Sequence, residues 1–448
     1  MYYNFRMEEN GLASLASTIY RWGLKGGLGI LDQGLFSGAN FLAIVFLARS
    51  LDTEDFGGFA VGFAALSFFM QIYTSFVLEP MSILGPSNYR ERIGSYLLAQ
   101  VRLLFLLATP TGVFLGFIIW LNQFIGNDTI ATSVLIFSSI SLPFILFPLL
   151  MRRIFYVLLK PGLALLGSAI YFLGLFLVFF LLVRIRVLNE ISSVLLLSLA
   201  GLLSGFTLLL FLQNEKSPED PVDLKAILVE TWSFGKWLIV SGVLIGLATQ
   251  SQIYLTGVLS RLEEAGAVRI LQTFIQPMMF TSTAFSALAT PAITVDFASG
   301  FYKSMRRKMI RFTLILGGTA LVYELLLVLF SASLNQILFE EKYSSYTSQI
   351  PIWGLVPILL SFFWGGAISL QVSQKPQAML IISGFWALFS FVPGLIIIPA
   401  WGAWGATVSI VMGFIAAFVS TWVLYWLWVH RVYMNDGGRY ADHKEHSM

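Results

Sequence analysis

Residues 214–223 read NEKSPEDPVD, the most polar run between the long apolar segments of this chain. The run lies near the middle of the 448 residues, with six apolar segments before it and six after it. Two groups of six segments indicate a protein built from two halves. The nature of the apolar segments therefore decides the fold.

The composition indicates that the apolar segments are membrane-spanning helices. Hydrophobic residues make up 57% of the chain and charged residues 11%, whereas a soluble protein has about 25% charged residues. A spanning helix needs about 20 mostly apolar residues. Since 57% of 448 is about 255 residues, the sequence predicts an all-α polytopic membrane protein. We expect about 12 transmembrane helices in two pseudo-symmetric six-helix bundles.

Proline, glycine and charged residues separate the apolar segments and place the boundaries. We predict spans at 26–50, 57–79, 95–121, 130–151, 162–183, 192–213, 236–259, 266–290, 312–334, 351–373, 377–399 and 402–429. The predicted domains are an amphipathic N-terminal segment at 1–25, a first lobe at 26–213, a linker at 214–235, a second lobe at 236–430 and a tail at 431–448.

The distribution of basic residues predicts the orientation of the chain. An even number of spans places both termini on one side of the membrane. Of the 27 lysines and arginines, 20 fall in loops on that side, among them Arg152 and Arg153. Basic loops face the cytoplasm under the positive-inside rule. We therefore expect both termini, and the predicted linker, in the cytoplasm.

The sequence argues against several classes of function. The net charge is only +3 and the basic residues are scattered, so a nucleic-acid partner is not expected. The chain has no cysteine, and its three histidines, His430, His443 and His446, lie at or beyond the last apolar segment. A thiolate or histidine centre inside the membrane is thereby excluded. Since no catalytic triad, phosphate-binding loop or metal-ligand set is present, we expect a protein that is not an enzyme and has no cofactor.

A faint internal repeat relates the two halves. The turn Glu54-Asp55-Phe56-Gly57 corresponds to Glu263-Glu264-Ala265-Gly266, and each is followed by a helix that ends near a proline, Pro80 or Pro291. Parallel repeats predict two bundles related by an axis along the membrane normal, with substrate between them. Glycine pairs with GxxxG spacing, such as Gly34 with Gly38 and Gly242 with Gly246, predict close helix packing.

Polar side chains inside four spans are candidates for a substrate cavity. Such residues are costly in the membrane, so they face a partner or a wet cavity. They lie in the first, second, seventh and eighth spans, which correspond in pairs under the repeat. The alternative is hydrogen bonding between helices. The candidates are Asp32, Gln33, Asn40, Gln71, Tyr73, Gln250, Gln252, Tyr254, Gln272 and Gln276.

Two acidic residues are candidates for coupling transport to an ion gradient. Asp32 lies a few residues inside the first span, where it carries a proton or faces interfacial water. Glu324 follows Phe312 by twelve residues, about 18 Å along a helix, which places it near the bilayer centre. There it has a coupling role, or a structural hydrogen bond holds it.

Three arginines are candidates for contact with a phosphate group. Arg49 and Arg269 lie at the outer ends of the first and eighth spans, and Arg102 precedes the apolar run of the third. Arginines at such positions also anchor helices to lipid headgroups or snorkel to the membrane surface. For Arg152 and Arg153 the orientation signal is a sufficient explanation.

A short stretch of the first span resembles a known family. Residues 32–41 (DQGLFSGANF), 47–49 (LAR) and 54–57 (EDFG) are similar to the opening of bacterial polysaccharide flippases. These are the O-antigen, exopolysaccharide and teichoic-acid exporters of the multidrug/oligosaccharidyl-lipid/polysaccharide exporter superfamily. The twelve spans in two lobes extend the resemblance over the whole chain.

The resemblance implies a function, a location and partners. Such proteins move an undecaprenyl-pyrophosphate-linked oligosaccharide across the bacterial cytoplasmic (inner) membrane by alternating access, driven by a proton or sodium gradient, for surface polysaccharide biosynthesis. The expected partners are that lipid-linked substrate, membrane lipids and other polysaccharide-assembly membrane proteins. The candidate cavity here has few deep cations, which leaves the pyrophosphate contact unassigned.

Two other functions remain as alternatives. The first is an ion-coupled multidrug antiporter of the same fold, with Asp32 or Glu324 as its proton site. The second is a membrane glycosyl polymerase or ligase. Those enzymes carry a large polar outer loop, whereas every outer loop predicted here is short.

Overall fold

The computed structural model describes residues 11–124, 130–214, 222–373 and 376–435. Every regular element among these residues is a helix. The first part of the chain contains α1 Gly11–Ser50, α2 Thr53–Tyr73, η1 Thr74–Leu78, α3 Glu79–Asn88, η2 Arg90–Arg92, α4 Ile93–Phe124, α5 Ile130–Val157, α6 Pro161–Arg184 and α7 Glu190–Gln213. The second part contains α8 Leu224–Leu259, α9 Leu262–Ala298, α10 Tyr302–Phe339, η3 Ser344–Gln349, α11 Ile350–Val372, α12 Pro376–Trp401, α13 Ala403–Tyr425 and η4 Trp426–Asn435.

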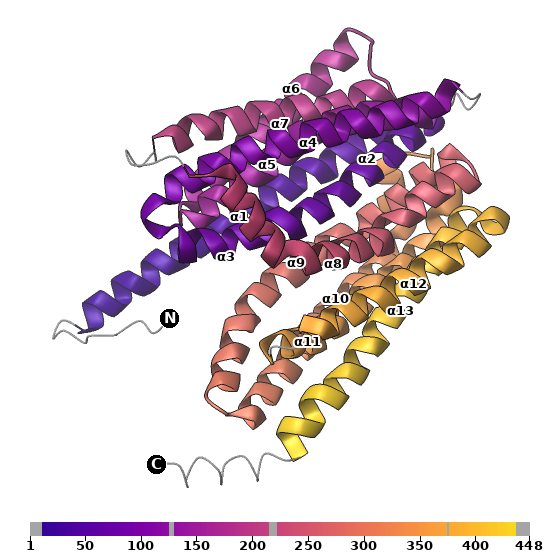
Figure 1. The fold of residues 1–448 in the computed structure, drawn as a ribbon. Helices are drawn as coiled ribbons and strands as arrows, with labels where there is room; N and C mark the ends of the chain where they lie inside the picture. The colour runs from indigo at the N-terminus through magenta and orange to yellow at the C-terminus, as the bar shows by residue number, and fades with distance from the viewer. Residues whose placement is uncertain (1–10, 125–129, 215–221, 374–375, 436–448) are drawn as a thin grey trace.

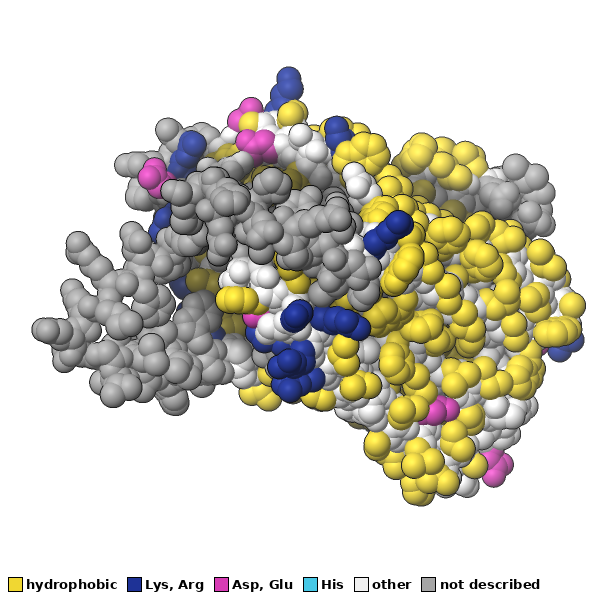
Figure 2. Space-filling model, turned by 90° about the horizontal axis from the view of Figure 1, so that it is seen from below, with side chains coloured by type: hydrophobic (Ala, Val, Ile, Leu, Met, Phe, Trp, Pro, Cys, Tyr) yellow, Lys and Arg dark blue, Asp and Glu magenta, His cyan; other side chains and the backbone are white. Residues whose placement is uncertain are grey.

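The helices have the length and surface of membrane spans. In the described part of the chain, 11 helices are long and apolar enough to cross a membrane. Each predicted span lies within a helical segment to within one residue. The predicted eighth span lies in α9, which has 37 residues but is not one of these 11 helices. Large apolar side chains such as Leu177 (70% exposed) and Ile396 (72% exposed) point outward, and Figure 2 shows a flank that is almost wholly hydrophobic.

The helices form two pseudo-symmetric bundles, which are α1 to α7 and α8 to α13 (Figure 1). The beginning of α1 and the end of η4 lie at the same end of the molecule, here called the termini side. The opposite end is called the far side. Helices α2, α8 and α9 make the main contacts between the bundles.

The sequence repeat appears at equivalent helix starts on the far side. Glu54 and Asp55 lie in the first turn of α2, and Glu263 and Glu264 lie in the first turn of α9. Carboxylates at a helix N-terminus interact favourably with the helix dipole. The same local stabilisation therefore begins corresponding helices in the two lobes.

Two repeat-related glycines bring the lobes together on the far side. Gly57 of α2 lies against the backbone of Leu262 and against Gly266 of α9, and a Cβ atom at Gly57 would overlap the Leu262 carbonyl. This contact, here called the glycine seam, requires two residues without side chains. The lobes can approach this closely because small residues allow helix backbones to meet.

Two cations reinforce the glycine seam by capping helix ends across it. The Arg49 guanidinium donates to the carbonyl oxygens of Leu338 (2.9 Å) and Ile337 at the end of α10. In return, the Lys342 ammonium donates to the carbonyls of Arg49 and Leu51 (2.9 Å) at the end of α1. Cations stabilise the carbonyl end of a helix, so each lobe caps a helix of the other.

Toward the termini side the lobes diverge, as Figure 1 shows. Gln33, Ile44 and Ala48 share one face of α1 by their helical spacing. Ile44 and Ala48, nearer the far side, are buried, whereas Gln33 is exposed. This face of α1 is thus covered near the far side and open nearer the termini.

Most of the predicted glycine packing occurs between neighbouring helices, with one difference. Gly242 and Gly246 of α8 pack against Ser75 and Phe68 of the first lobe. By contrast, a Cβ atom at Gly34 or at Gly38 would meet nothing within 4 Å. The small residues on this part of α1 border open space rather than another helix.

Several elements are longer than the sequence indicated. Helix α8 begins at Leu224, so much of the predicted linker 214–235 is helical. Helix α1 runs without a break from Gly11 to Ser50, so the described part of the predicted segment 1–25 continues into the first span. Most of the predicted tail 431–448 lies outside the described residues.

The glycine seam can be tested with one methyl group. We expect Gly57→Ala to lower the free energy of unfolding by about 1–3 kcal/mol, the usual range for overpacking. Thermal unfolding of purified protein measures this. Gly34→Ala is the matched control and should be neutral or slightly stabilising, because alanine favours the helix and has room there. Equal stability of the two variants would show that the seam is not tightly constrained.

Candidate functional site

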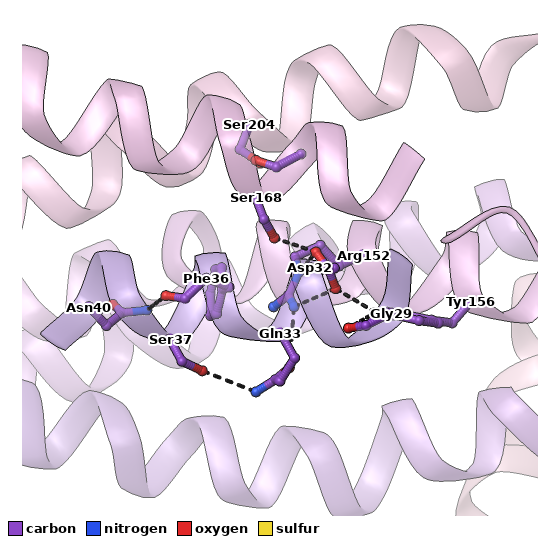
Figure 3. Close-up of polar contacts among 11 residues, drawn as sticks. Gly29, Asp32, Gln33, Phe36, Ser37, Asn40, Arg152, Tyr156, Ser168 and Ser204 are labelled. Atoms are coloured by element: carbon purple, nitrogen blue, oxygen red, sulfur yellow. Dashed lines mark hydrogen bonds and ion pairs between the residues drawn. The ribbon is translucent and has the colours of Figure 1, made fainter. Parts of the chain in front are cut away.

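The centre of the site is Asp32, a carboxylate buried inside the first lobe. Asp32 lies on α1 and is 0% exposed. Burial of an isolated carboxylate costs far more free energy than a fold can supply, so such a group needs charge and hydrogen-bond partners. Helices α5 and α6 bring those partners to it (Figure 3).

Arg152 of α5 supplies the opposite charge. Its Nη2 lies 2.7 Å from Asp32 Oδ2 and its Nε lies 3.2 Å from Oδ1, a bidentate pair. The guanidinium carbon also lies 4.0 Å from the centre of the Phe36 ring. Arg152 is 6% exposed. The pair is therefore dry, and an aromatic face covers its cation.

Two hydroxyl groups complete the shell around the carboxylate. Tyr156, one turn after Arg152 on α5, donates to Asp32 Oδ2 at 2.6 Å. Ser168 of α6, itself fully buried, donates to Oδ1. Asp32 thus accepts hydrogen bonds from two other helices, and its charge holds α1, α5 and α6 together.

The polar network continues along α1 toward the middle of the lobe. Phe36 stacks on Tyr171 of α6 with 4.8 Å between ring centres, and the Tyr171 hydroxyl donates to Asn40 Oδ1 at 3.1 Å. A small cavity of about 90 Å³ borders Phe36, Asn40 and Tyr171. In the other direction Gln33 accepts a hydrogen bond from Arg152 at 3.4 Å and donates to Ser37.

The charges of Asp32 and Arg152 depend on each other. Protonation of Asp32 would leave Arg152 as a buried cation without a counter-charge, which is strongly unfavourable. Gln33, exposed on α1, connects Arg152 to the open face of that helix.

In the second lobe, Arg269 lies where the two bundles meet. It is 5% exposed, and its guanidinium carbon lies 4.4 Å from the centre of the Phe63 ring of α2. Its Nη1 donates to Gln272 Oε1 at 2.8 Å, and Gln272 in turn donates to the Thr249 carbonyl at 3.2 Å. Arg269 thus joins the lobes instead of ending at lipid headgroups.

The ten predicted cavity residues do not line one common pocket. Asp32, Gln33 and Asn40 belong to the network around Arg152. Gln250 and Tyr254 line a cavity of about 320 Å³ between α2, α8 and α12. Gln272 binds Arg269, and Tyr73 lines a different cavity in the first lobe. Gln71 and Gln276 are half-buried.

Two of these residues correct the cavity interpretation. Gln252 is 1% exposed and donates to the Ser390 hydroxyl of α12, so it joins two helices of one lobe. Asp32 is enclosed by its partners and presents no oxygen to a solute. The Asp32 carboxylate and the Gln252 amide nitrogen are thus bonded to neighbouring helices, whereas Gln252 Oε1 has no hydrogen-bond partner among the described residues.

The remaining predicted charges lie apart from the network. Arg49 binds α10 across the glycine seam, and Arg102 is exposed on α4. Glu324 of α10 is half-buried, and its carboxylate occupies the space above Gly354 of α11. Exposed leucines flank Glu324, so it lies near the outer flank of the second lobe.

Four residues of the network are not among the candidates that the sequence indicates: Arg152, Tyr156, Ser168 and Tyr171. In the sequence Arg152 ends a span next to Arg153, a position that the orientation signal explains. The clue to its role is Asp32, which requires a cation once α1 is buried. Arg152 and Tyr156 lie four residues apart on one face of α5, but nothing in the sequence indicates that this face meets α1.

Two predictions concern metals and histidines. His443 and His446 lie outside the described residues, as does the side chain of His430. No group of three His, Cys, Asp or Glu side chains in the described ranges could hold a metal ion.

Comparisons with known proteins show what this fold resembles. No protein-family model and no curated protein matches the sequence. Among solved structures, an inward-facing multidrug resistance transporter of the MATE family, in the MOP superfamily, aligns with a TM-score of 0.71 at 13% identity. The alignment covers 88% of this chain and 94% of that one. The MATE multidrug transporter DinF-BH in complex with R6G aligns at 0.69 and 14% identity, over 97% and 99%.

A second MATE structure has a different conformation. An outward-facing MATE family transporter aligns with a TM-score of 0.58 at 14% identity, over 91% and 94% of the two chains. The TM-score is thus higher for the inward-facing structure than for the outward-facing one. The chain thus has a MATE-like transporter fold, and these structures do not confirm the polysaccharide flippase family.

The pairing of Asp32 with Arg152 can be tested by removing one charge and then both. We expect Arg152→Gln to lower the free energy of unfolding by about 3–5 kcal/mol, because it leaves a buried carboxylate unpaired. The double variant Asp32→Asn/Arg152→Gln should recover most of that loss.

Thermal unfolding in detergent measures both effects, with Arg102→Gln as the control for loss of an exposed arginine. If the double variant were no more stable than Arg152→Gln alone, the pairing of the two residues would be wrong.

Proposed function

We propose that this protein is a proton-coupled exporter of amphipathic organic solutes, of the multidrug antiporter type. The observation that carries the proposal is the buried Asp32–Arg152 pair inside one lobe of a two-lobed, transporter-like fold. A dry ion pair that ties three helices together is a suitable place for a proton to change the packing of a lobe. The inward-facing resemblance supports alternating access.

The coupling would act through α1. Asp32 and Arg49 lie 17 residues apart on one unbroken helix, about 25 Å at 1.5 Å per residue. Asp32 holds the helix to α5 and α6, and Arg49 holds its other end to α10 of the second lobe. When a proton neutralises Asp32, α1 is released at one end and the contact at the other end changes with it. The equilibrium then shifts by as much as the proton prefers one state over the other.

The solute would bind between the lobes. The cavity between α2, α8 and α12 is lined by aromatic and apolar side chains with a few polar groups, among them Phe68, Gln250 and Tyr254. Pockets of this composition take flat or amphipathic organic molecules. The neighbour DinF-BH, which is described in complex with R6G, is a multidrug transporter of the same fold.

The direction of transport follows from the predicted orientation. With the termini in the cytoplasm, as the basic loops predict, the lobes open to the cytoplasm and close toward the outside. An exporter takes up its solute in this conformation. We place the protein in the cytoplasmic membrane of a bacterium, without a cofactor.

A second candidate is the flippase of undecaprenyl-pyrophosphate-linked oligosaccharides. One observation favours the flippase: residues 32–57, which resemble that family, also contribute most of the α1 side chains of the site. Asp32, Gln33, Phe36 and Asn40 all belong to the network, and Arg49 belongs to the seam. Partners from polysaccharide assembly would accompany this function.

The proton role of Asp32 can be tested by transport. In proteoliposomes with an imposed pH gradient, we expect Asp32→Asn to reduce rhodamine 6G transport at least tenfold, because its amide cannot exchange a proton. Asp52→Asn is the matched control, since Asp52 is exposed and its side chain caps no helix.

Glu324→Gln in the same assay separates the two coupling candidates. We expect transport within about twofold of the unmodified protein, because Glu324 lies apart from the Asp32 network. A large loss in this variant with normal transport in Asp32→Asn would place the coupling site in the second lobe.

The substrate class can be decided with two cargoes. We expect the reconstituted protein to move rhodamine 6G and not a fluorescent undecaprenyl-pyrophosphate-linked oligosaccharide, whose leaflet can be followed by quenching from outside. The reverse result would reject the antiporter and establish the flippase.

A further inference from the structure

The first lobe contains a cavity that is separate from the Asp32 network. It has a volume of about 280 Å³ and lies between α2, η1, α4 and α5, with α8 of the second lobe closing one side. Along α4 it extends from Gln100 to Thr111, which is about 16 Å at 1.5 Å per residue. A cavity this long for its volume is narrow. Its shape suits one extended chain better than a compact ring system.

The cavity opens sideways, toward the hydrocarbon of the membrane. Leu107 at its edge is 40% exposed and Thr111 is exposed. The neighbouring α4 side chains Leu106 (58% exposed) and Phe114 (62% exposed) point outward on the same stretch of helix. None of the side chains that line the cavity is charged. An ionic headgroup therefore has no partner inside it.

Two of the residues that line this cavity have a buried hydroxyl group without a hydrogen-bond partner in the described part of the chain. These residues are Tyr73, at the end of α2, and Thr231 of α8. An unsatisfied hydroxyl is costly in an apolar environment. A water molecule does not satisfy these hydroxyls well, because a buried water needs two to four polar partners and the cavity is mostly apolar. Oxygen atoms on an otherwise apolar ligand could satisfy such groups after a small side-chain movement.

The backbone beside the cavity is also unusual. Residues Thr74–Leu78 form a π-helix, η1, and Phe76 and Val77 from this segment line the cavity. Pro80 follows and has no N–H for the helical ladder. Wide helical turns of this kind often occur at functional sites.

We propose that this cavity binds the chain of a single-chain amphiphile, with a neutral ester or hydroxyl oxygen held by Tyr73 and Thr231. The apolar chain lies along α4 and enters from the bilayer. Tyr73 belongs to the first lobe and Thr231 to the second, so the ligand bridges the lobes. Its binding stabilises the conformation in which α8 packs on η1, where Gly235 meets Phe76.

Binding can be measured on the full-length protein by native mass spectrometry, with 1-lauroylglycerol as the probe. Its twelve-carbon chain and neutral oxygens match the cavity. We expect Tyr73→Phe and Thr231→Val each to weaken binding about three- to tenfold, the difference that one hydrogen bond makes. Dodecyltrimethylammonium, with the same chain but a cation and no acceptor, should bind far more weakly.

Filling the cavity provides a second variant with a matched control. Leu104→Trp places a large side chain at a lining position, and Leu106→Trp places it on the exposed side of the same helix. We expect the first to abolish binding of 1-lauroylglycerol and the second to leave it unchanged. If Leu104→Trp fails to fold, the two nearly isosteric hydroxyl variants still decide the result.

Transport distinguishes a bilayer lipid from the chain of a transported substrate. If the natural ligand is a bilayer lipid, Leu104→Trp keeps rhodamine 6G transport within about twofold of the unmodified protein. In that case 1-lauroylglycerol raises the thermal stability of the unmodified protein but not that of Leu104→Trp. If the cavity instead holds the chain of a transported substrate, 1-lauroylglycerol inhibits rhodamine 6G transport and Leu104→Trp abolishes that transport. Unchanged binding in both hydroxyl variants, or equal binding of the cationic probe, would overturn the site.

Discussion

The close contact of Gly57 with Leu262 and Gly266 is the constraint on which the rest of the structure depends. Two lobes of membrane helices have little hydrophobic reason to associate, since lipid is as apolar as their surfaces. Association therefore requires close backbone contact and polar bonds. The glycine seam provides the first, and the reciprocal caps from Arg49 and Lys342 provide the second. Because both occur on the far side, the lobes diverge toward the termini side.

Helix α1 connects this seam to the buried charge of the first lobe. Its far-side end is held by α10, and its middle is held by Arg152, Tyr156 and Ser168 through Asp32. A buried ion pair contributes little net stability, whereas the loss of one partner is severe. Such a pair is better suited to selecting one packing of helices than to strengthening the fold. The coupling role that we propose for Asp32 rests on this property.

Helix α8 of the second lobe resembles α1 of the first lobe in that it contacts both lobes. It packs on α2 and η1 through small residues, Gly235, Gly242 and Gly246, and it also forms part of two cavities. One of these cavities lies between the lobes and is lined by Gln250. The other is open at Leu107 and Thr111 of α4 and is closed on its α8 side by Thr231. Occupants of either cavity touch both lobes. Both the solute and a lipid chain can therefore influence the lobe positions, provided that they bind the two conformations unequally.

The sequence by itself determined the membrane class, the approximate positions of the long helices, and the division into two related halves. These properties depend on local composition and on the 3.6-residue period, which any helix in lipid must obey. It also identified Asp32, Gln33 and Asn40 as important, because polar residues are rare in such helices. Only the tertiary structure decided their partners. Arg152 and Ser168 are 120 and 136 residues away from Asp32, and Arg49 meets α10 almost 290 residues away. The packing between distant segments decides which faces of the helices meet. It therefore also decides whether a polar side chain lines a cavity or bonds to a neighbouring helix, and no local sequence pattern indicates this packing.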